Sequence, residues 1–274
     1  MKKERGDIDR RRFLIGAAGA ATTAATGLAW AARPCPPPTL SVSGGSSVST
    51  PCKADTPGLL PSIKLTSAAA SGSYGWTVGH AFKQGDVPSG AYITGNSGTL
   101  QADIRNRWPD GSVKFAVLSG IAEFTQNSAK SIALATTSAA PSGSNVAEPT
   151  NLDVSVTLSG TGAGTYTLQS CLGIDRSTWS RGSPGRVRQI LGPVMSEFHY
   201  YRPTSDEHIA VWFYVRRYAN GATEVETVVE NGWLQVASPG QRDYSVTVSV
   251  GGASKYSGSL HHYSHARWSR VDWI

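Results

Sequence analysis

The sequence predicts an all-β protein built from antiparallel sheets, with little helix outside its N-terminal segment. Beyond about residue 58, several stretches alternate apolar and polar residues with a period of two. Short turns rich in Gly, Pro, Asn and Asp separate these stretches, and no window of a dozen residues in 32–274 combines a 3.6-residue period with helix caps. Because isolated hairpins are marginal in water, we expect the strands to close into a barrel or to stack as a sandwich.

The first 31 residues have the three parts of a bacterial export signal. A charged start leads into a twin-arginine motif formed by Arg10, Arg11, Phe13 and Leu14. The Ala/Gly/Thr-rich stretch 16–30 is too short and too weakly apolar to span a bilayer core of about 30 Å. An A-x-A site predicts cleavage after Ala31. We therefore expect engagement of the twin-arginine translocon, a periplasmic or secreted product and no stable membrane anchor.

The positive charge of the chain is concentrated in this segment. Residues 1–31 contain six of the 25 Lys/Arg and three of the 19 Asp/Glu, which leaves 19 against 16 in the remaining 243 residues. A net charge of +3 over that length is ordinary, so the composition predicts neither nucleic acid nor an anionic membrane as a partner.

Three cysteines are too few to form the main framework of an exported protein. In an oxidising compartment Cys35 and Cys52 can close a loop of about 18 residues, which stabilises by about 3 kcal/mol in the chain-entropy model. Cys171 is then left over, either as a buried small hydrophobe or as a reactive or intermolecular thiol.

Composition and periodicity divide the rest of the chain into a leader and two β units. Residues 32–57 are Pro-rich and then Ser-rich without periodicity, which predicts a flexible leader. In the first unit, 58–140, two alternating strands flank Trp108–Ser112, where Pro109-Asp110-Gly111 predicts a hairpin turn.

The second unit, 150–274, repeats the same pattern of strands and turns. Alternation at 152–158 and 244–250 predicts two strands, while 208–218 is apolar on both faces and turns at Asn220-Gly221. The chain ends on Trp273 and Ile274 without a polar tail, so we expect it to be the front piece of a longer protein.

Several motifs resemble a known family. The segments 79–90, 100–103 and Trp108–Lys114 are similar to the opening β domain of rhamnogalacturonan exolyase/YetA-like proteins, and 228–233 and 261–268 resemble segments of large bacterial and phage-associated proteins. The resemblance implies a RIFT-type β-barrel followed by a β-sandwich, and in longer relatives a helical toroid that completes an active site. It implies a carbohydrate-active setting and transfers no catalytic residue to this chain.

A first cluster with suitable chemistry lies at 197–202. Acidic-polysaccharide lyases need a base for the α-proton and a cation for the uronate carboxylate. His199, Tyr201 and Arg202 are candidates for base, acid and charge clamp, although strand alternation puts Arg202 on the opposite face. Sugar binding or aromatic packing at a strand end are the alternatives.

A second cluster, 261–268, holds half of the six histidines. In a strand only two of the imidazoles converge, so we assign no metal site. Arg and aromatic side chains suit a sugar ring and its carboxylate, and core or edge packing is the alternative. The candidate sugar-binding residues of this cluster are Tyr263, His265, Arg267 and Trp268. Trp76 and Trp108, near turns, are further candidates if their rings are exposed rather than packed in a core.

Motifs for serine-hydrolase, zinc-protease, thiol-redox and nucleotide chemistry are absent from the sequence, and we expect no cofactor. Three hypotheses follow. The chain is a non-catalytic β module that binds polysaccharide or cell-surface glycan, a polysaccharide lyase or glycosidase in its own right, or a phage-related structural or adhesive protein. A cleft favours an enzyme, and a flat aromatic patch favours adhesion.

Overall fold

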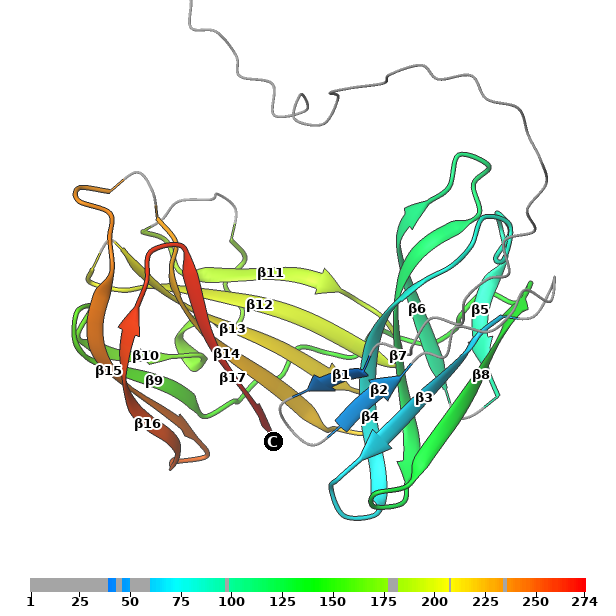
Figure 1. The fold of residues 1–274 in the computed structure, drawn as a ribbon, viewed down its shortest axis with the longest axis horizontal. Helices are drawn as coiled ribbons and strands as arrows, with labels where there is room; N and C mark the ends of the chain where they lie inside the picture. Colours follow the sequence, from blue (N-terminus) through cyan, green and yellow to red (C-terminus); the bar gives the residue numbers. More distant parts are fainter. Residues whose placement is uncertain are drawn as a thin grey trace, which may run out of the picture. The chain divides into compact units, whose positions relative to one another are not determined.

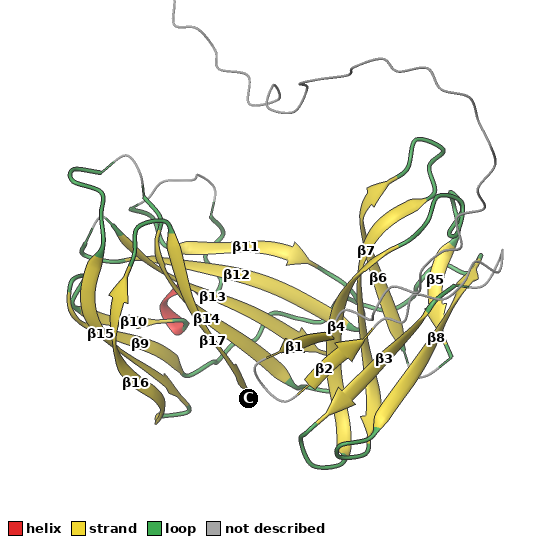
Figure 2. Ribbon diagram, viewed as in Figure 1, coloured by secondary structure: helices red, strands yellow, loops and turns green. Residues whose placement is uncertain are grey.

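The computed structural model describes residues 39–42, 46–49, 60–96, 99–176, 182–206, 208–233 and 236–274 (Figures 1 and 2). Within these ranges the regular structure is β-strand, apart from one 3-10 turn, η1 (Gln169–Cys171). All pairings between named strands are antiparallel, which confirms the predicted fold class. The predicted export signal and the Cys35–Cys52 pair lie outside the described residues. Among the described residues no helix is long and apolar enough to cross a membrane.

The first β unit contains two sheets, with the strand orders β1-β2-β3-β8-β5 and β4-β7-β6. Its strands are β1 (Thr39–Val42), β2 (Ser46–Ser49), β3 (Ser62–Ser67), β4 (Gly72–Ala81), β5 (Tyr92–Gly95), β6 (Leu100–Arg107), β7 (Val113–Phe124) and β8 (Ala129–Thr137). Both sheets are open in the described part of the chain, so the expected barrel does not close. β1 and β2 lie within the stretch predicted to be a flexible leader, where they pair with each other and β2 pairs with β3.

The turn between β6 and β7 has the predicted hairpin chemistry. The backbone N–H of Trp108 donates to the Ser112 carbonyl at 2.8 Å, and Gly111 has a φ of 82°. The Asp110 carboxylate accepts from both the backbone N–H and the hydroxyl of Ser112, at 3.0 and 2.6 Å. Glycine is needed at position 111 because L-residues rarely adopt this left-handed conformation.

The second β unit is a two-layer sandwich, with the strand orders β10-β9-β15-β16 and β11-β12-β13-β14-β17 (Figure 1). Its strands are β9 (Val154–Gly160), β10 (Gly164–Thr167), β11 (Gly185–Ile190), β12 (Met195–Pro203), β13 (Ile209–Tyr218), β14 (Thr223–Asn231), β15 (Arg242–Val250), β16 (Ala253–His262) and β17 (Ala266–Trp273). This unit agrees with the predicted sandwich. The hairpin predicted at Asn220-Gly221 is also present, with Gly221 at a φ of 90°.

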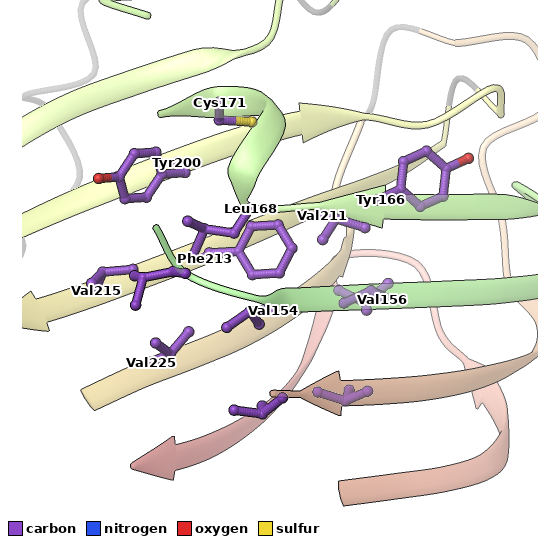
Figure 3. Close-up of a cluster of buried hydrophobic side chains, with 14 of the residues drawn as sticks. Val154, Val156, Tyr166, Leu168, Cys171, Tyr200, Val211, Phe213, Val215 and Val225 are labelled. Carbon is purple, nitrogen blue, oxygen red and sulfur yellow. The ribbon is translucent and has the colours of Figure 1, made fainter. Parts of the chain in front are cut away.

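The sandwich core forms from the inward-facing residues of both sheets (Figure 3). Val154 and Val156 of the four-stranded sheet lie on one side, and Val211, Phe213 and Val215 of the five-stranded sheet lie on the other. Burying a side chain of this size contributes roughly 1.5–3 kcal/mol. Because successive strand residues point to opposite faces, this core also determines which side chains lie on the two outer faces.

The two β units share contacts through Gln101 of β6 and Tyr218 of β13. The Gln101 side chain accepts hydrogen bonds from the backbone N–H groups of Val194 and Met195, at 3.0 and 2.9 Å, and donates to the Met195 carbonyl at 3.0 Å. The Tyr218 hydroxyl lies 2.9 Å from the hydroxyl of Thr77 on β4.

Candidate functional site

Four ring-bearing side chains gather on the outer face of the five-stranded sheet. They are His199 and Tyr201 of β12 and Trp212 and Tyr214 of β13, which we call the aromatic block. The register places His199 opposite Tyr214 and Tyr201 opposite Trp212. Ring centroids are 4.1 Å apart in the first pair, 4.7 Å in the second and 6.1 Å between Trp212 and Tyr214. These separations are typical of interacting aromatic rings.

Hydrogen bonds to neighbouring charged side chains hold the polar atoms of the aromatic block in place. The Trp212 indole Nε1–H donates to Glu230 Oε2 at 2.8 Å. Glu230 Oε1 accepts from Arg267 Nε at 2.8 Å, and Arg267 Nη1 also donates to the Tyr214 hydroxyl at 3.4 Å. Burial raises the pKa of Tyr214, so its phenol stays protonated at neutral pH.

The edge of the aromatic block at Tyr201 is covered by Arg176. The guanidinium carbon lies 4.0 Å from the centroid of the Tyr201 ring and 5.8 Å from that of Trp212. A guanidinium at this distance from a ring face makes a cation–π contact. Tyr201 is 1% exposed, whereas His199, Trp212 and Tyr214 are partly exposed.

Beside His199 runs a row of ion pairs across β12, β13 and β14. Glu197 Oε1 bonds to His199 Nε2 at 2.6 Å, and Glu197 Oε2 accepts from Arg216 Nε at 2.6 Å. Arg216 also donates to Glu224 at 2.8 Å. Burial of Glu197 opposes its ionisation, but the bonds to His199 and Arg216 outweigh that effect and lower its pKa to about 2.

One carboxylate of this face differs from the others in its hydrogen bonds and ion pairs. Glu226 lies opposite Tyr214 in the strand register and makes no hydrogen bond or ion pair with any residue that the structure describes. Among the described residues, the charged side chains around the aromatic block are Glu197, Glu224, Glu226, Glu230, Arg176, Arg216 and Arg267. With four carboxylates and three guanidiniums, this surround is not basic.

Strand alternation separates the three residues predicted as base, acid and charge clamp. His199 and Tyr201 belong to the aromatic block, whereas Arg202 lies on the inner face with Tyr200. The buried Arg202 Nε has no hydrogen-bond partner within the described ranges. Arg267, predicted from the other cluster, instead places a guanidinium beside Tyr214.

The 261–268 segment is not one continuous strand. β16 ends at His262, and β17 begins at Ala266 after a turn in which His265 has a φ of 62°. Trp268 packs on the sandwich core beside Tyr256 with ring centroids 5.0 Å apart, while Tyr263 is 63% exposed. No group of three or more metal-binding side chains occurs in the part of the chain that the structure describes.

The remaining candidates lie apart from the aromatic block. Trp76 is 8% exposed and packs in the core of the first unit. The half-buried Trp108 donates its indole N–H to the Phe82 carbonyl at 3.1 Å, with the Lys114 ammonium 4.5 Å from its ring centroid. Cys171 is fully buried in the sandwich core, and this burial raises the pKa of its thiol. Of the two alternatives from the sequence, this environment fits a buried small apolar residue.

The sequence interpretation missed Trp212 and Tyr214. The stretch 208–218 is apolar at nearly every position, which is the pattern of a strand buried on both faces. The sequence does contain a signal: Trp212 and Tyr214 alternate with Val211, Phe213 and Val215, the residues of this strand that face the core.

No model of a known protein family matches this chain, and a search of the curated proteins finds no match to it. The resemblance to rhamnogalacturonan exolyase/YetA-like proteins therefore rests on the quoted motifs alone.

Proposed function

We propose that this chain is an exported, non-catalytic β module that binds polysaccharide on the outer face of its five-stranded sheet. The observation that carries the proposal is the aromatic block, whose partly exposed rings are fixed by hydrogen bonds within a charged surround. The apolar face of a pyranose ring packs favourably on an aromatic ring. Export is supported by the Arg10-Arg11 motif and the A-x-A site that follows it.

The surround of the aromatic block supplies hydrogen-bond partners for sugar hydroxyls. The Glu226 carboxylate, which has no hydrogen-bond partner among the described residues, can accept hydrogen bonds from sugar hydroxyls, and Arg267, with 55% of its side chain exposed, can donate hydrogen bonds to sugar oxygens. Because Arg267 is already held by Glu230 and Tyr214, its engagement by a ligand loses less conformational entropy than that of a free side chain. The near balance of carboxylates and guanidiniums favours a neutral glycan over an acidic one.

The same geometry is less suited to lyase chemistry. A tyrosine base is more effective when its pKa is lowered toward the operating pH, whereas burial raises the pKa of Tyr214. Arg202, the predicted charge clamp, lies on the other face of β12 from His199 and Tyr201. These observations support binding without catalysis.

Affinity electrophoresis of the purified chain through gels containing neutral or acidic polysaccharides tests the proposal. Wild type is expected to be retarded by at least one neutral polysaccharide. Tyr214→Ala and Trp212→Ala should each weaken binding by about tenfold, since a stacked aromatic residue is often a dominant contact. Tyr92→Ala removes an exposed tyrosine of the first unit, 37% exposed, and serves as the matched control.

Two outcomes contradict the proposal. Equal retardation of Tyr214→Ala, Trp212→Ala and wild type shows that the aromatic block does not bind the glycan. New ultraviolet absorbance from unsaturated products, lost in His199→Ala, shows that the chain is a lyase.

A further inference from the structure

The outer face of the four-stranded sheet is covered with hydroxyl groups. Along β9, β15 and β16, inward Val, Leu and Tyr residues alternate with outward residues that are mostly Ser and Thr, with Asp243, Lys255 and His261 as exceptions. The outward hydroxyl residues form regular rows across the sheet: Thr165, Thr157, Thr247 and Ser257 in one row, and Ser159, Ser245 and Ser259 in the next. We call this surface the hydroxyl face. Its short side chains allow a ligand to approach the sheet closely.

A groove of about 400 Å³ lies at one end of the hydroxyl face. Its polar lining comprises Ser159, Asp243, Ser245, Ser259 and His261. This volume is within the range of roughly 300–1,000 Å³ that is usual for small-ligand sites. Tyr244 and Leu260 complete the lining, and the hydroxyls of Ser245 and Ser259 lie 3.3 Å apart across β15 and β16.

Asp243 and His261 of the groove lining are hydrogen-bonded to each other, and the exposed ring of Tyr263, next to the lining, contacts His261. Asp243 Oδ1 bonds to His261 Nδ1 at 2.5 Å, and the second carboxylate oxygen, Oδ2, has no partner among the described residues. The Tyr263 ring stands edge-on to the His261 ring, with centroids 5.0 Å apart and planes at 90°. Because Tyr263 is 63% exposed, a face of its ring is open to a ligand.

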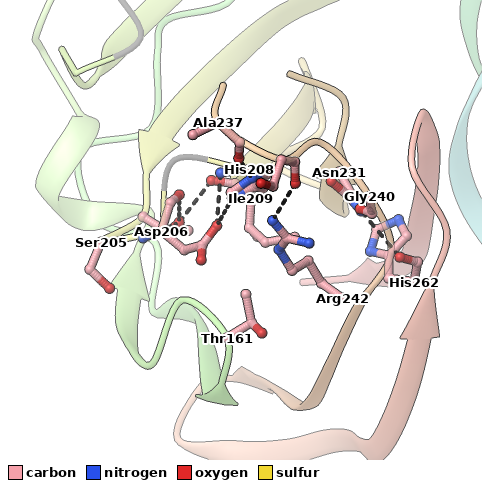
Figure 4. A network of polar contacts seen from close by, with 12 residues as sticks. Thr161, Ser205, Asp206, His208, Ile209, Asn231, Ala237, Gly240, Arg242 and His262 are labelled. Carbon is pink, nitrogen blue, oxygen red and sulfur yellow. Dashed lines mark hydrogen bonds and ion pairs between the residues drawn. The ribbon is translucent and has the colours of Figure 1, made fainter. Parts of the chain in front are cut away.

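Hydrogen bonds behind the groove fix the backbone that carries Asp243 and His261 (Figure 4). Asn231 Nδ2 donates to the carbonyls of Gly240 and His262, at 2.8 and 3.1 Å. Arg242 donates to the Ser238 carbonyl at 3.1 Å, so its guanidinium is engaged outside the groove. The start of β15 and the end of β16 are therefore tied together.

We propose that this groove is a second carbohydrate-binding site, which takes a neutral sugar residue. The unpartnered Asp243 oxygen and the serine hydroxyls bond to sugar hydroxyls, and Tyr263 packs on the apolar face of the ring. An acidic sugar is disfavoured, because no Lys or Arg side chain lines the groove within the described residues and the Asp243 carboxylate does. The proposal does not require the aromatic block to bind glycan.

The groove and the aromatic block lie on opposite outer faces of the sandwich, so one chain can bind glycan on both faces. A module with both sites bridges two glycan chains, and on a multivalent surface its avidity exceeds the affinity of either site. The hydroxyl face thereby extends the proposed function from binding to cross-linking.

Calorimetric titration with neutral hexasaccharides of glucose, xylose and mannose units tests the groove. We expect two ligand equivalents per wild-type chain, and one for Tyr263→Ala or Asp243→Ala. Ser257→Ala, on the hydroxyl face outside the groove lining, is the matched control and should bind like wild type. Wild type should also make a soluble neutral polysaccharide turbid, which Tyr263→Ala should not.

The outcomes separate the two sites. If Tyr263→Ala binds no ligand and Trp212→Ala binds like wild type, the result supports glycan binding in the groove and contradicts glycan binding on the aromatic block. Unchanged stoichiometry and turbidity in both groove variants overturn the groove proposal, whatever Trp212→Ala does. The absence of binding to every neutral hexasaccharide overturns it as well.

Discussion

Glu197 holds a negative charge at a place where only 10% of its side chain is exposed. Its pKa is lowered from the ordinary glutamate value of 4.5 to about 2 in the fold. A carboxyl whose pKa falls on folding stabilises the fold fully above the unfolded value, and this stabilisation is lost as the pH falls through the folded value. We therefore predict that the free energy of unfolding decreases by about 3 kcal/mol between pH 5 and pH 2 because of this group. Urea denaturation at a series of pH values measures it.

The control for this prediction is Glu197→Gln. The amide is similar in shape but cannot ionise, so the variant should be less stable than wild type at pH 7 and should lose less stability on acidification. If both proteins lose stability in parallel between pH 5 and pH 2, Glu197 is not the group responsible.

Gly75 is required by the close approach of Tyr218. A Cβ atom at position 75 would lie 2.3 Å from the nearest atom of the Tyr218 ring, which is 1% exposed and has no room to move. Gly75→Ala should therefore destabilise the chain by about 1–3 kcal/mol through overpacking. Thermal and urea denaturation measure this cost. Gly182→Ala is the matched control, because no atom lies within 4 Å of its added Cβ. Equal stability of Gly75→Ala and Gly182→Ala contradicts the packing argument.

At the residue scale, the sequence predicts turn geometry and strand faces better than it predicts which side chains are buried. The Pro109-Asp110-Gly111 turn was predictable because the conformational preferences of Pro and Gly act within a few residues. Alternation also predicted that Arg202 lies opposite His199. The burial of Trp76 was not predictable, since its ring fits over Gly120, where a Cβ would lie 2.5 Å from it, and this pairing of β4 with β7 is a tertiary contact.

At the scale of elements, Gln101 acts as a tie between β6 and the start of β12. Its side-chain amide is 6% exposed and makes three hydrogen bonds to the backbone of Val194 and Met195. Gln101→Ala leaves these buried backbone groups without partners, at a cost of roughly 1–3 kcal/mol each when water cannot replace the side chain. We predict a loss of about 2–4 kcal/mol in urea denaturation.

Gln126→Ala provides the comparison, since its side chain donates a single hydrogen bond to the Ala68 carbonyl at an exposed position. This variant should lose less than about 1 kcal/mol, because water replaces an exposed partner. A loss in Gln101→Ala no greater than that in Gln126→Ala contradicts a role for Gln101 as a tie between the units.

The strands were predicted correctly where alternation is strong, whereas the predicted closure of the first unit into a barrel was wrong for the described residues. In the first unit, β6 pairs only with β7 and β5 only with β8, so both sheets stay open within the described residues. Whether two sheet edges pair depends on contacts between residues far apart in the sequence. The hairpin of β1 and β2 was missed because serine-rich segments lack hydrophobic alternation. The turn before β17 was missed because a positive φ at His265 has no sequence signal comparable to glycine.

At the scale of the whole molecule, the sandwich combines a hydrophobic interior with two chemically different outer faces. The five-stranded sheet presents rings within a near-neutral set of charges, and the four-stranded sheet presents short hydroxyl residues. This agrees with the sequence-based conclusion that the excess positive charge belongs to residues 1–31.

The contacts between the two β units predict cooperative unfolding. Ile190, Met195 and Tyr218 of the second unit form a small core with Val117 and Ile121 of the first. Because each unit also has its own core, loss of this shared one should uncouple them. We predict that wild type unfolds in a single transition, with coincident tryptophan fluorescence and circular dichroism. Tyr218→Ala, which also removes the bond to Thr77, should give two separated transitions, and a single cooperative transition in that variant contradicts the coupling.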